Sequence, residues 1–189
     1  YFIPHGSFPP TTEPVYKKKV EAETIGYVGT INDTIDISLF SKILEETKLK
    51  IIIAGPFSEC NKKNKAFFKD LFYNDRVEYL GHLNIHARER AIKNLDICML
   101  PYHSKVNGFA LKFFDYLNFG KPIFSTIYDF QWLDIYKKFI KFYSHKFDLN
   151  DFLIDLYDSW DMKYFNAAIS LASQSTWKDR VDTIFDKMN

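Results

Sequence analysis

Cysteine, long apolar runs and an excess of one charge are what this sequence lacks. Its two cysteines, Cys60 and Cys98, are too few and too irregularly placed for a disulfide framework or a zinc site. No run of about 18 apolar residues could span a bilayer. With 25 Lys and Arg against 24 Asp and Glu, the formal net charge is +1, which does not indicate a nucleic-acid-binding surface. We therefore expect no nucleic-acid partner, no integral membrane segment in this chain and a reducing, cytoplasmic location.

Apolar and aromatic residues are abundant instead. They make up 47% and 18% of the 189 residues, which excludes a disordered chain and suffices for the core of one domain. We interpret the basic runs Lys17-Lys18-Lys19 and Lys62-Lys63 as solvated faces. Cys98 lies in the apolar run 97–100, so we expect it to be a small buried residue.

Short β-prone runs alternate with helical patterns after a proline-rich start. Residues 1–22 contain four prolines without apolar periodicity and are predicted to form an interdomain linker. The alternation over 23–189 predicts an α/β, Rossmann-like doubly wound parallel sheet of about six strands with C-terminal helices. Asp36 is expected to cap the first helix. The strands are predicted at 24–28, 51–54, 77–80, 96–100, 123–126 and 138–143, and helices from 37, at 66–72, at 85–94 and from 177.

Residues 107–126 are predicted to form one helix, a glycine stop and one buried strand. Gly120 suits the left-handed position after a helix end, and Lys121-Pro122 begins the strand. In a doubly wound sheet, ligands bind outside the carboxyl ends of the strands. A helix that starts there presents unpaired amides to an anion. This segment is therefore predicted to face a phosphate.

The same segment resembles the nucleotide-sugar motif of GT-B glycosyltransferases, in the retaining group 1, family 4-like branch. The likeness lies in Leu-Lys-Phe-Phe-Asp-Tyr-Leu at 111–117 and in the following Gly-Lys-Pro-Ile. It extends along the chain through Gly-Tyr-Val-Gly, Ile-Ala-Gly-Pro, Val-Glu-Tyr-Leu-Gly and Asp-Ile-Cys-Met-Leu-Pro-Tyr, in that order. The resemblance implies the C-terminal, donor-binding half of a two-domain hexosyltransferase.

The resemblance assigns catalytic roles to two residues of the predicted helix. Asn107 stands at the first acidic position of the motif, near the donor sugar, and Lys112 would neutralise the departing diphosphate. Asp115 stands at the second acidic position and would bind the ribose hydroxyls. The backbone at the helix start would add donors to the phosphates. These further donor-binding residues are Gly108, Phe109, Ala110 and Leu111.

Two turns and one loop complete the implied donor site. Gly29-Thr30 would let the donor phosphates or sugar approach the first strand, and the Gly81-His82 loop would hold the nucleobase. Tyr102 would line the same cleft. The basic residues that often follow the first turn are absent here. Lys112 would therefore have to supply most of the positive charge.

The resemblance also sets expectations for the whole enzyme. The start of the chain resembles the stretch that joins the two GT-B domains, so we expect an N-terminal acceptor domain outside this sequence. The co-substrate would be a UDP- or GDP-sugar, and the acceptor a carbohydrate or lipid-linked molecule, as in polysaccharide biosynthesis. No cofactor and no metal are expected. Peripheral contact of the full-length protein with the inner membrane face is left open.

Other interpretations remain open. Asn107 could be only a helix cap, Lys112 could form an exposed ion pair, and Tyr102 could merely pack. His82 and His86 are four residues apart but lack a third ligand at suitable spacing for a metal. The fold could instead belong to a nucleotide-sugar epimerase, to a flavodoxin-like receiver, or to a degenerate binding or assembly module. Such a module would use its aromatic C-terminal helices.

Overall fold

The structure is a computed structural model, and it describes residues 6–103, 111–126 and 136–188. Within these residues, strands and helices alternate as the sequence predicts. The strands are β1 Thr24–Val28, β2 Lys50–Ala54, β3 Val77–Tyr79, β4 Ile97–Leu100, β5 Ile123–Ser125 and β6 Lys141–Phe142. The helices are α1 Ile37–Glu46, α2 Lys62–Leu71, α3 Ile85–Asn94, α4 Lys112–Leu117, α5 Leu149–Asp158, α6 Met162–Ser173 and α7 Trp177–Met188, with a short 3-10 turn at Lys137–Phe139.

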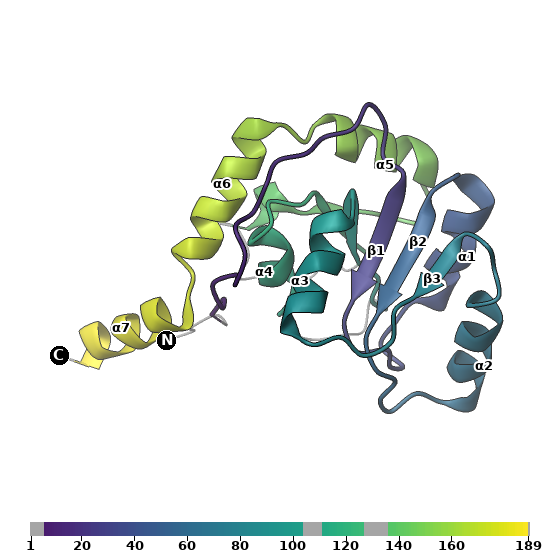
Figure 1. Cartoon of the computed structure of the whole chain (residues 1–189), viewed down its shortest axis with the longest axis horizontal. Helices are drawn as coiled ribbons and strands as arrows, with labels where there is room; N and C mark the ends of the chain where they lie inside the picture. The colour runs from purple at the N-terminus through teal and green to yellow at the C-terminus, as the bar shows by residue number, and fades with distance from the viewer. Residues whose placement is uncertain (1–5, 104–110, 127–135, 189) are drawn as a thin grey trace.

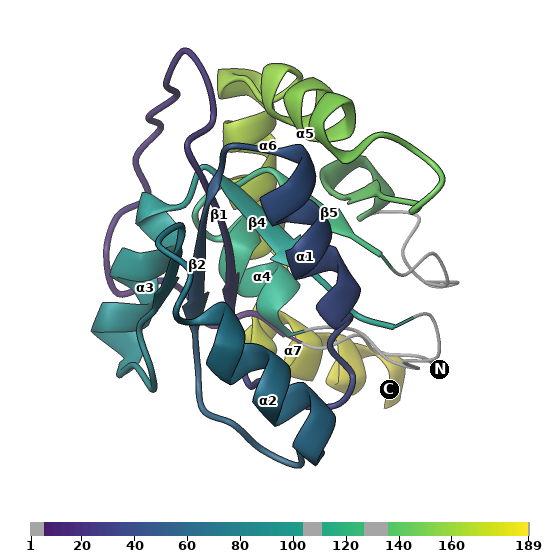
Figure 2. The same cartoon turned by 90° about the vertical axis from the view of Figure 1, so that its right-hand side faces the viewer.

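The six strands form one parallel sheet in the order β3-β2-β1-β4-β5-β6. The chain moves outward from β1 to β3, then returns to the other side of β1 to place β4. Helices α3 and α4 lie on one side of β1 and β2, while α1 and α2 lie on the other (Figure 1). Helix α5 packs on α1, and α6 packs on α4 (Figure 2). The predicted Rossmann-like fold is confirmed, and its switch point lies between β1 and β4.

Local sequence explains where the helices begin. The Asp36 carboxylate accepts a hydrogen bond from the Ser38 amide and caps α1, as predicted. Helix α2 starts earlier than the predicted residue 66, because the Asn61 side chain caps it by accepting from the Asn64 amide. The predicted strand over 138–143 is wrong in its first half. Residues 137–139 form the 3-10 turn, and β6 has two residues.

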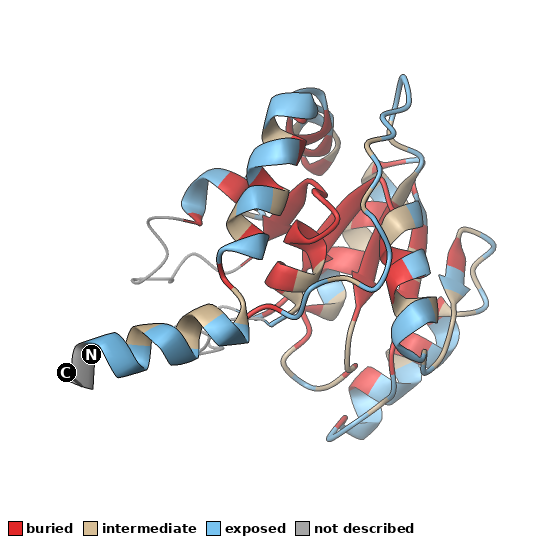
Figure 3. Ribbon diagram, turned by 60° about the vertical axis from the view of Figure 1, so that its left-hand side comes forward, coloured by how far each residue is buried: buried red, intermediate tan, exposed pale blue. Residues whose placement is uncertain are grey.

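The buried residues lie mainly in the strands and on the helix faces against them, whereas α7 is exposed along most of its length (Figure 3). All four residues of β4 are buried, including Cys98 as expected. Helix α7 begins behind a box in which Thr176 and Asp179 exchange hydrogen bonds. Its apolar stripe is not part of the core, because Val181, Ile184 and Phe185 are 39–61% exposed.

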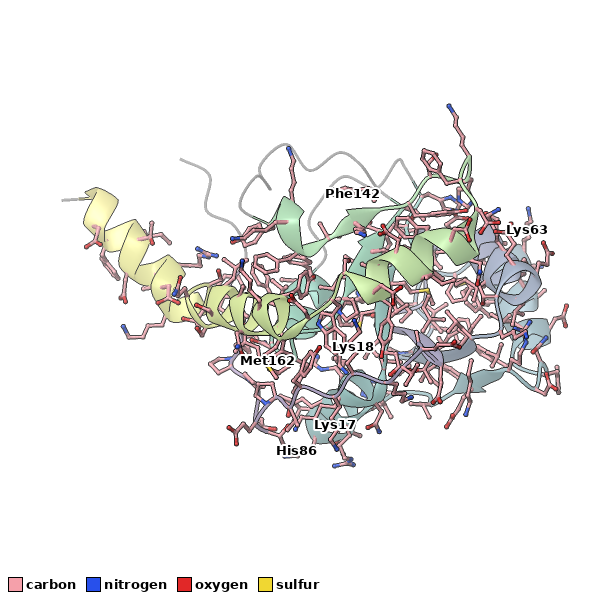
Figure 4. The ribbon with its side chains drawn as sticks, turned by 90° about the horizontal axis from the view of Figure 1, so that it is seen from above. Lys17, Lys18, Lys63, His86, Phe142 and Met162 are labelled. Atoms are coloured by element: carbon pink, nitrogen blue, oxygen red, sulfur yellow. The ribbon has the colours of Figure 1, made fainter. Side chains whose placement is uncertain are left out.

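The described part of the predicted linker lies against the domain. Ser7 pairs with Thr176 in a parallel bridge, and Thr11 donates to the Glu89 carboxylate through its amide and its hydroxyl. Lys18 donates to the carbonyls of Asp158 and Trp160 (Figure 4). Lys18 is therefore not a purely solvated lysine, contrary to our interpretation of the basic run.

The end of α4 and the start of β5 are fixed by buried contacts. Gly120 has φ +59°, so it takes the left-handed conformation that was predicted, and a side chain there would meet the Phe165 ring. The Trp160 indole donates to the Gly120 carbonyl (2.7 Å). The ammonium of Lys121 donates to the carbonyls of Lys93 and Leu95 at the end of α3. Burial lowers the pKa of Lys121.

Helix α4 is described from Lys112 onward, with Leu111 as the residue before it. The predicted residues Asn107, Gly108, Phe109 and Ala110 lie outside the described residues. None of the helices in the described part of the chain combines the length and apolarity needed to cross a membrane.

Candidate nucleotide-sugar site

The carboxyl ends of β1 and β4 are tied together at the switch point. The Asp36 amide donates to the Pro101 carbonyl (2.8 Å), and the His103 amide donates to the Thr34 carbonyl (2.9 Å). Ile35 and Tyr102 form an antiparallel bridge between the same two segments. The rim of the sheet is thus a hydrogen-bonded frame at the position where doubly wound folds bind ligands.

Helix α4 is attached to this rim by Tyr116, which is fully buried. The Tyr116 hydroxyl accepts from the Val28 amide at the end of β1 (3.0 Å) and lies 3.5 Å from the Met99 carbonyl of β4. Because Tyr116 holds α4 to both strands, the polar residues of the helix have fixed positions relative to the rim.

Lys112 lies across Gly29, the residue that follows β1. A Cβ atom on Gly29 would fall 1.5 Å from Cε of Lys112 and 2.7 Å from its Nζ. The ammonium lies 5.5 Å from the centre of the Tyr27 ring and 6.0 Å from that of Tyr102, within the range of a cation–π contact. Two residues from different predicted motifs therefore meet, and the absence of a side chain at position 29 makes room for the lysine.

The predicted first turn is closely packed. Gly55, with φ +138°, follows β2 and lies so close to the Gly29 carbonyl that a side chain would clash. The Thr30 carbonyl accepts from the Tyr27 hydroxyl (2.8 Å). Gly55 lacks room for a side chain because the Gly29 backbone lies against it, and Gly29 lacks room because Lys112 does. These contacts alone account for a glycine at both positions, with no ligand needed.

Asp115 lies one helical turn beyond Lys112 and faces α3. Its Oδ2 is 3.9 Å from Nη1 of Arg88, and the Asp115 side chain is 27% exposed. Burial raises the pKa of Asp115, whereas the charges of Arg88 and Lys112 oppose the rise. Asp115 is therefore at the edge of the core and is reachable from solvent.

The predicted nucleobase loop follows β3. Gly81 has φ +66°, nothing lies within 4 Å of the place where its Cβ would be, and its carbonyl accepts from the Gly55 amide. His82 is exposed beside it. This loop is open to solvent at His82, and it leads into α3 three residues later.

Tyr102 packs instead of lining an open surface. It is 8% exposed, its ring meets Tyr27 edge-on, and its carbonyl accepts from the Thr126 hydroxyl. His103 and Leu111 are exposed. Tyr102 itself is mostly covered, and its ring centre lies 6.0 Å from the Lys112 ammonium.

The acidic residues after β1 are engaged in local structure. Asp33 accepts from the amide and side chain of Asn61 and from Asn64. Asp36, besides capping α1, lies 2.9 Å from Nε2 of His145. Burial alone would raise the pKa of Asp36. Hydrogen bonds from Ser38 and His145 outweigh this effect and lower that pKa. These carboxylates are used by the fold.

Arg88 is the site residue that sequence reasoning missed. The pattern indicated only a charged helix over 85–94, and its one relevant signal was a basic residue just after the predicted base loop.

Among the residues that the structure describes, no cluster of three or more His, Cys, Asp or Glu could hold a metal ion. His86 contacts Thr11 through Nδ1 (3.1 Å) instead.

Solved structures share this arrangement of strands and helices. WaaB, a lipopolysaccharide outer core galactosyltransferase, matches with a TM-score of 0.64 and 17% identity over 98% of this chain and 55% of its own. HepE of Anabaena, solved in complex with UDP and glucose, matches with a TM-score of 0.63 and 13% identity over 88% and 48%. AviGT4, a glycosyltransferase involved in avilamycin A biosynthesis, gives 0.64 and 13% over 91% and 54%.

The fold is that of GT-B glycosyltransferases. At such low identities the likeness establishes the fold, and the sequence itself matches no family model and no curated protein. This chain spans about half the length of these GT-B structures. It fits the C-terminal half that the sequence motifs indicated.

Proposed function

We propose that this domain binds the nucleotide-activated sugar, a UDP- or GDP-sugar, for a GT-B glycosyltransferase. The observation that carries the proposal is Lys112 lying across Gly29 at the carboxyl edge of the sheet. A lysine ammonium held there, above two tyrosine rings, is a point charge suited to a diphosphate.

Each site residue has a distinct task in this proposal. Lys112 neutralises charge on the diphosphate as the glycosyl bond breaks, which is where electrostatic stabilisation contributes most to the rate. Asp115, ionised, accepts hydrogen bonds from the ribose hydroxyls. The backbone of Gly81 and His82 contacts the base, and Asn107 orients the donor sugar. Because Asn107 is uncharged, it cannot stabilise an oxocarbenium ion as a carboxylate would.

The acceptor half lies outside this chain in the proposal. GT-B structures that match this chain are about twice as long, and HepE was solved with UDP and glucose. A preceding domain would bind a carbohydrate or lipid-linked acceptor, and the two halves together would transfer a hexosyl group with retention. This domain alone would bind the nucleotide and transfer little. No metal takes part, because Lys112 supplies the charge.

Calorimetric titration tests the proposal. UDP, GDP and ADP are titrated separately into the purified protein, with and without EDTA. Saturable binding of UDP or GDP, unchanged by EDTA, is the expected result. The absence of heat with all three nucleotides contradicts the proposal, and loss of binding in EDTA contradicts its metal-free form.

A second candidate is an assembly module without catalysis. The exposed apolar residues of α7 favour it, since Val181, Ile184 and Phe185 lie on the surface of the described domain. In this case a second copy of the chain would cover α7. Light scattering that shows a dimer, dissociated by Phe185→Lys, together with no nucleotide binding, would favour this candidate.

A further inference from the structure

Arg88 has an unmet hydrogen-bonding requirement. Its Nε is buried and has no hydrogen-bond partner among the described residues, and it is the only such buried side-chain atom found there. A buried donor without a partner is destabilising, and more so when it is charged. This nitrogen is covered by protein atoms, so a ligand can meet Arg88 only at the terminal nitrogens of its guanidinium, on a side chain that is 39% exposed.

The carboxylate beside Arg88 is not hydrogen-bonded to the terminal nitrogen that faces it. The 3.9 Å between Nη1 of Arg88 and Oδ2 of Asp115 is too long for a hydrogen bond. The neighbouring carboxylate of Glu89 is already used, because it accepts from the hydroxyls of Thr11 and Thr12. Arg88 and Asp115 thus face each other as donor and acceptor across a gap, with both side chains part-exposed.

A hydroxyl oxygen fits such a gap chemically. It can lie about 2.8 Å from both groups, donate its proton to the carboxylate and accept from the guanidinium. A neutral amine donor or an anion could satisfy only one of the two sides. A vicinal diol matches best, because a carboxylate has two oxygens and a guanidinium carries several donors in one plane.

We propose that Arg88 is a specificity-determining residue that, with Asp115, recognises the vicinal diol of the ribose. The inference builds on the proposed nucleotide-sugar function and adds a residue on α3 to a site otherwise formed by α4 and the loops after β1 and β3. Arg88 lies one turn into α3, shortly after the Gly81-His82 loop, so it lies near both the proposed base and Asp115. A ligand without the second hydroxyl leaves this pair unsatisfied and is rejected.

The test compares a ribonucleotide with its 2′-deoxy form. UDP and 2′-deoxy-UDP, or the guanosine pair if GDP binds better, are titrated into wild type, Arg88→Met and Arg88→Lys. Arg88→Met keeps the apolar stem, and Arg88→Lys keeps the charge without the planar fork. Arg90→Met is the matched control, since Arg90 is exposed on the same helix. Circular dichroism and thermal melting confirm that each variant is folded.

Wild type and Arg90→Met are expected to prefer the ribonucleotide by tenfold or more. Arg88→Met is expected to reduce that preference to twofold or less while changing the affinity for the deoxynucleotide by less than twofold. Arg88→Lys should lie closer to Arg88→Met than to wild type.

Two results overturn the inference while leaving the proposed function intact. One is an undiminished ribose preference in Arg88→Met, and the other is an equal loss of affinity for both nucleotides. By contrast, if wild type binds none of the nucleotides, the proposed function itself fails.

Discussion

At the scale of single residues, Lys112 brings an ammonium group to the end of β1. Lys112→Ala is expected to weaken UDP binding about 10- to 100-fold, the equivalent of one charge-assisted contact of about 1.5–3 kcal/mol. Uridine, which has no phosphate, should bind with less than a twofold change. Titration calorimetry of both ligands measures the difference. Lys163→Ala on α6 removes an exposed lysine and serves as the control. An equal loss for UDP and uridine would show that Lys112 is structural.

Gly29 offers an independent test of the same contact. Its backbone is outside the left-handed region, so Gly29→Ala introduces no backbone strain, but the new methyl group would displace Cε of Lys112. Because a flexible side chain can move aside, the fold should remain while UDP binding falls about as much as in Lys112→Ala. The double variant should bind no worse than either single variant, since both remove one interaction. A Gly29→Ala protein with wild-type affinity would contradict the geometry.

Asp115 gives nucleotide binding a dependence on pH. Only the ionised carboxylate accepts from both hydroxyls, and burial raises the pKa of Asp115 above its usual 3.8. Affinity for UDP should therefore begin to fall at a higher pH than for an ordinary aspartate, and at a still higher pH in Arg88→Met, where an opposing charge is gone. Asp115→Ala should weaken binding at least tenfold.

The pH effect is isolated by comparison with Asp115→Asn. That variant cannot titrate at position 115, so it retains the pH dependence of the nucleotide phosphates and of the other side chains of the site. Asp70→Ala on α2 controls for the loss of an exposed carboxylate. Superimposable pH profiles for wild type and Asp115→Asn would remove Asp115 from the site.

At the scale of elements, α1 depends on its cap. Asp36→Ala is expected to lower the free energy of unfolding by about 1–2 kcal/mol at pH 7, measured by urea denaturation. The pKa of Asp36 is lowered in the folded state, so its contribution is complete above the unfolded value of 3.8 and is lost as the pH falls through the folded value. The difference between wild type and Asp36→Ala should thus shrink in acid.

Two further variants separate the effect of the hydrogen-bonding cap from the effect of losing a negative charge. Asp36→Asn keeps a side-chain acceptor and should lose less stability than Asp36→Ala. Glu45→Ala, at an exposed position of α1, should change little. If Asp36→Ala is as stable as wild type, the cap contributes nothing measurable.

The same scale shows what local pattern can and cannot predict. The apolar strands and the helix over 85–94 were predictable because each is a local run of residues that favours one kind of structure. The start of α2 was missed because Asn61 precedes four polar residues, which hid the cap. The strand over 138–143 was overextended because its aromatic residues suit both a strand and the 3-10 turn that packs Phe139 into the core.

At the scale of the whole molecule, motif order predicted the sheet, but contacts between distant elements were out of reach. That Gly29 and Lys112 belong together followed from the GT-B resemblance, whereas their direct contact depends on how Tyr116 attaches α4 to two strands. Arg88 was missed for the same reason. Its partner is 27 positions away on another helix, and no periodicity within 85–94 points to it. The exposure of the α7 stripe also could not be read from its spacing.

The bridge between Ser7 and Thr176 has a consequence for how the protein is made. The partner of Ser7 is synthesised about 170 residues later, which at roughly 5–20 residues per second is a delay on the order of ten to thirty seconds. Ser7 bonds to the backbone of Ser175 and Trp177, so this segment can take its place only after α6 and the start of α7 have been made. Strands β1, β2 and β3, which lie nearer to Ser7 in the sequence, are available for pairing earlier.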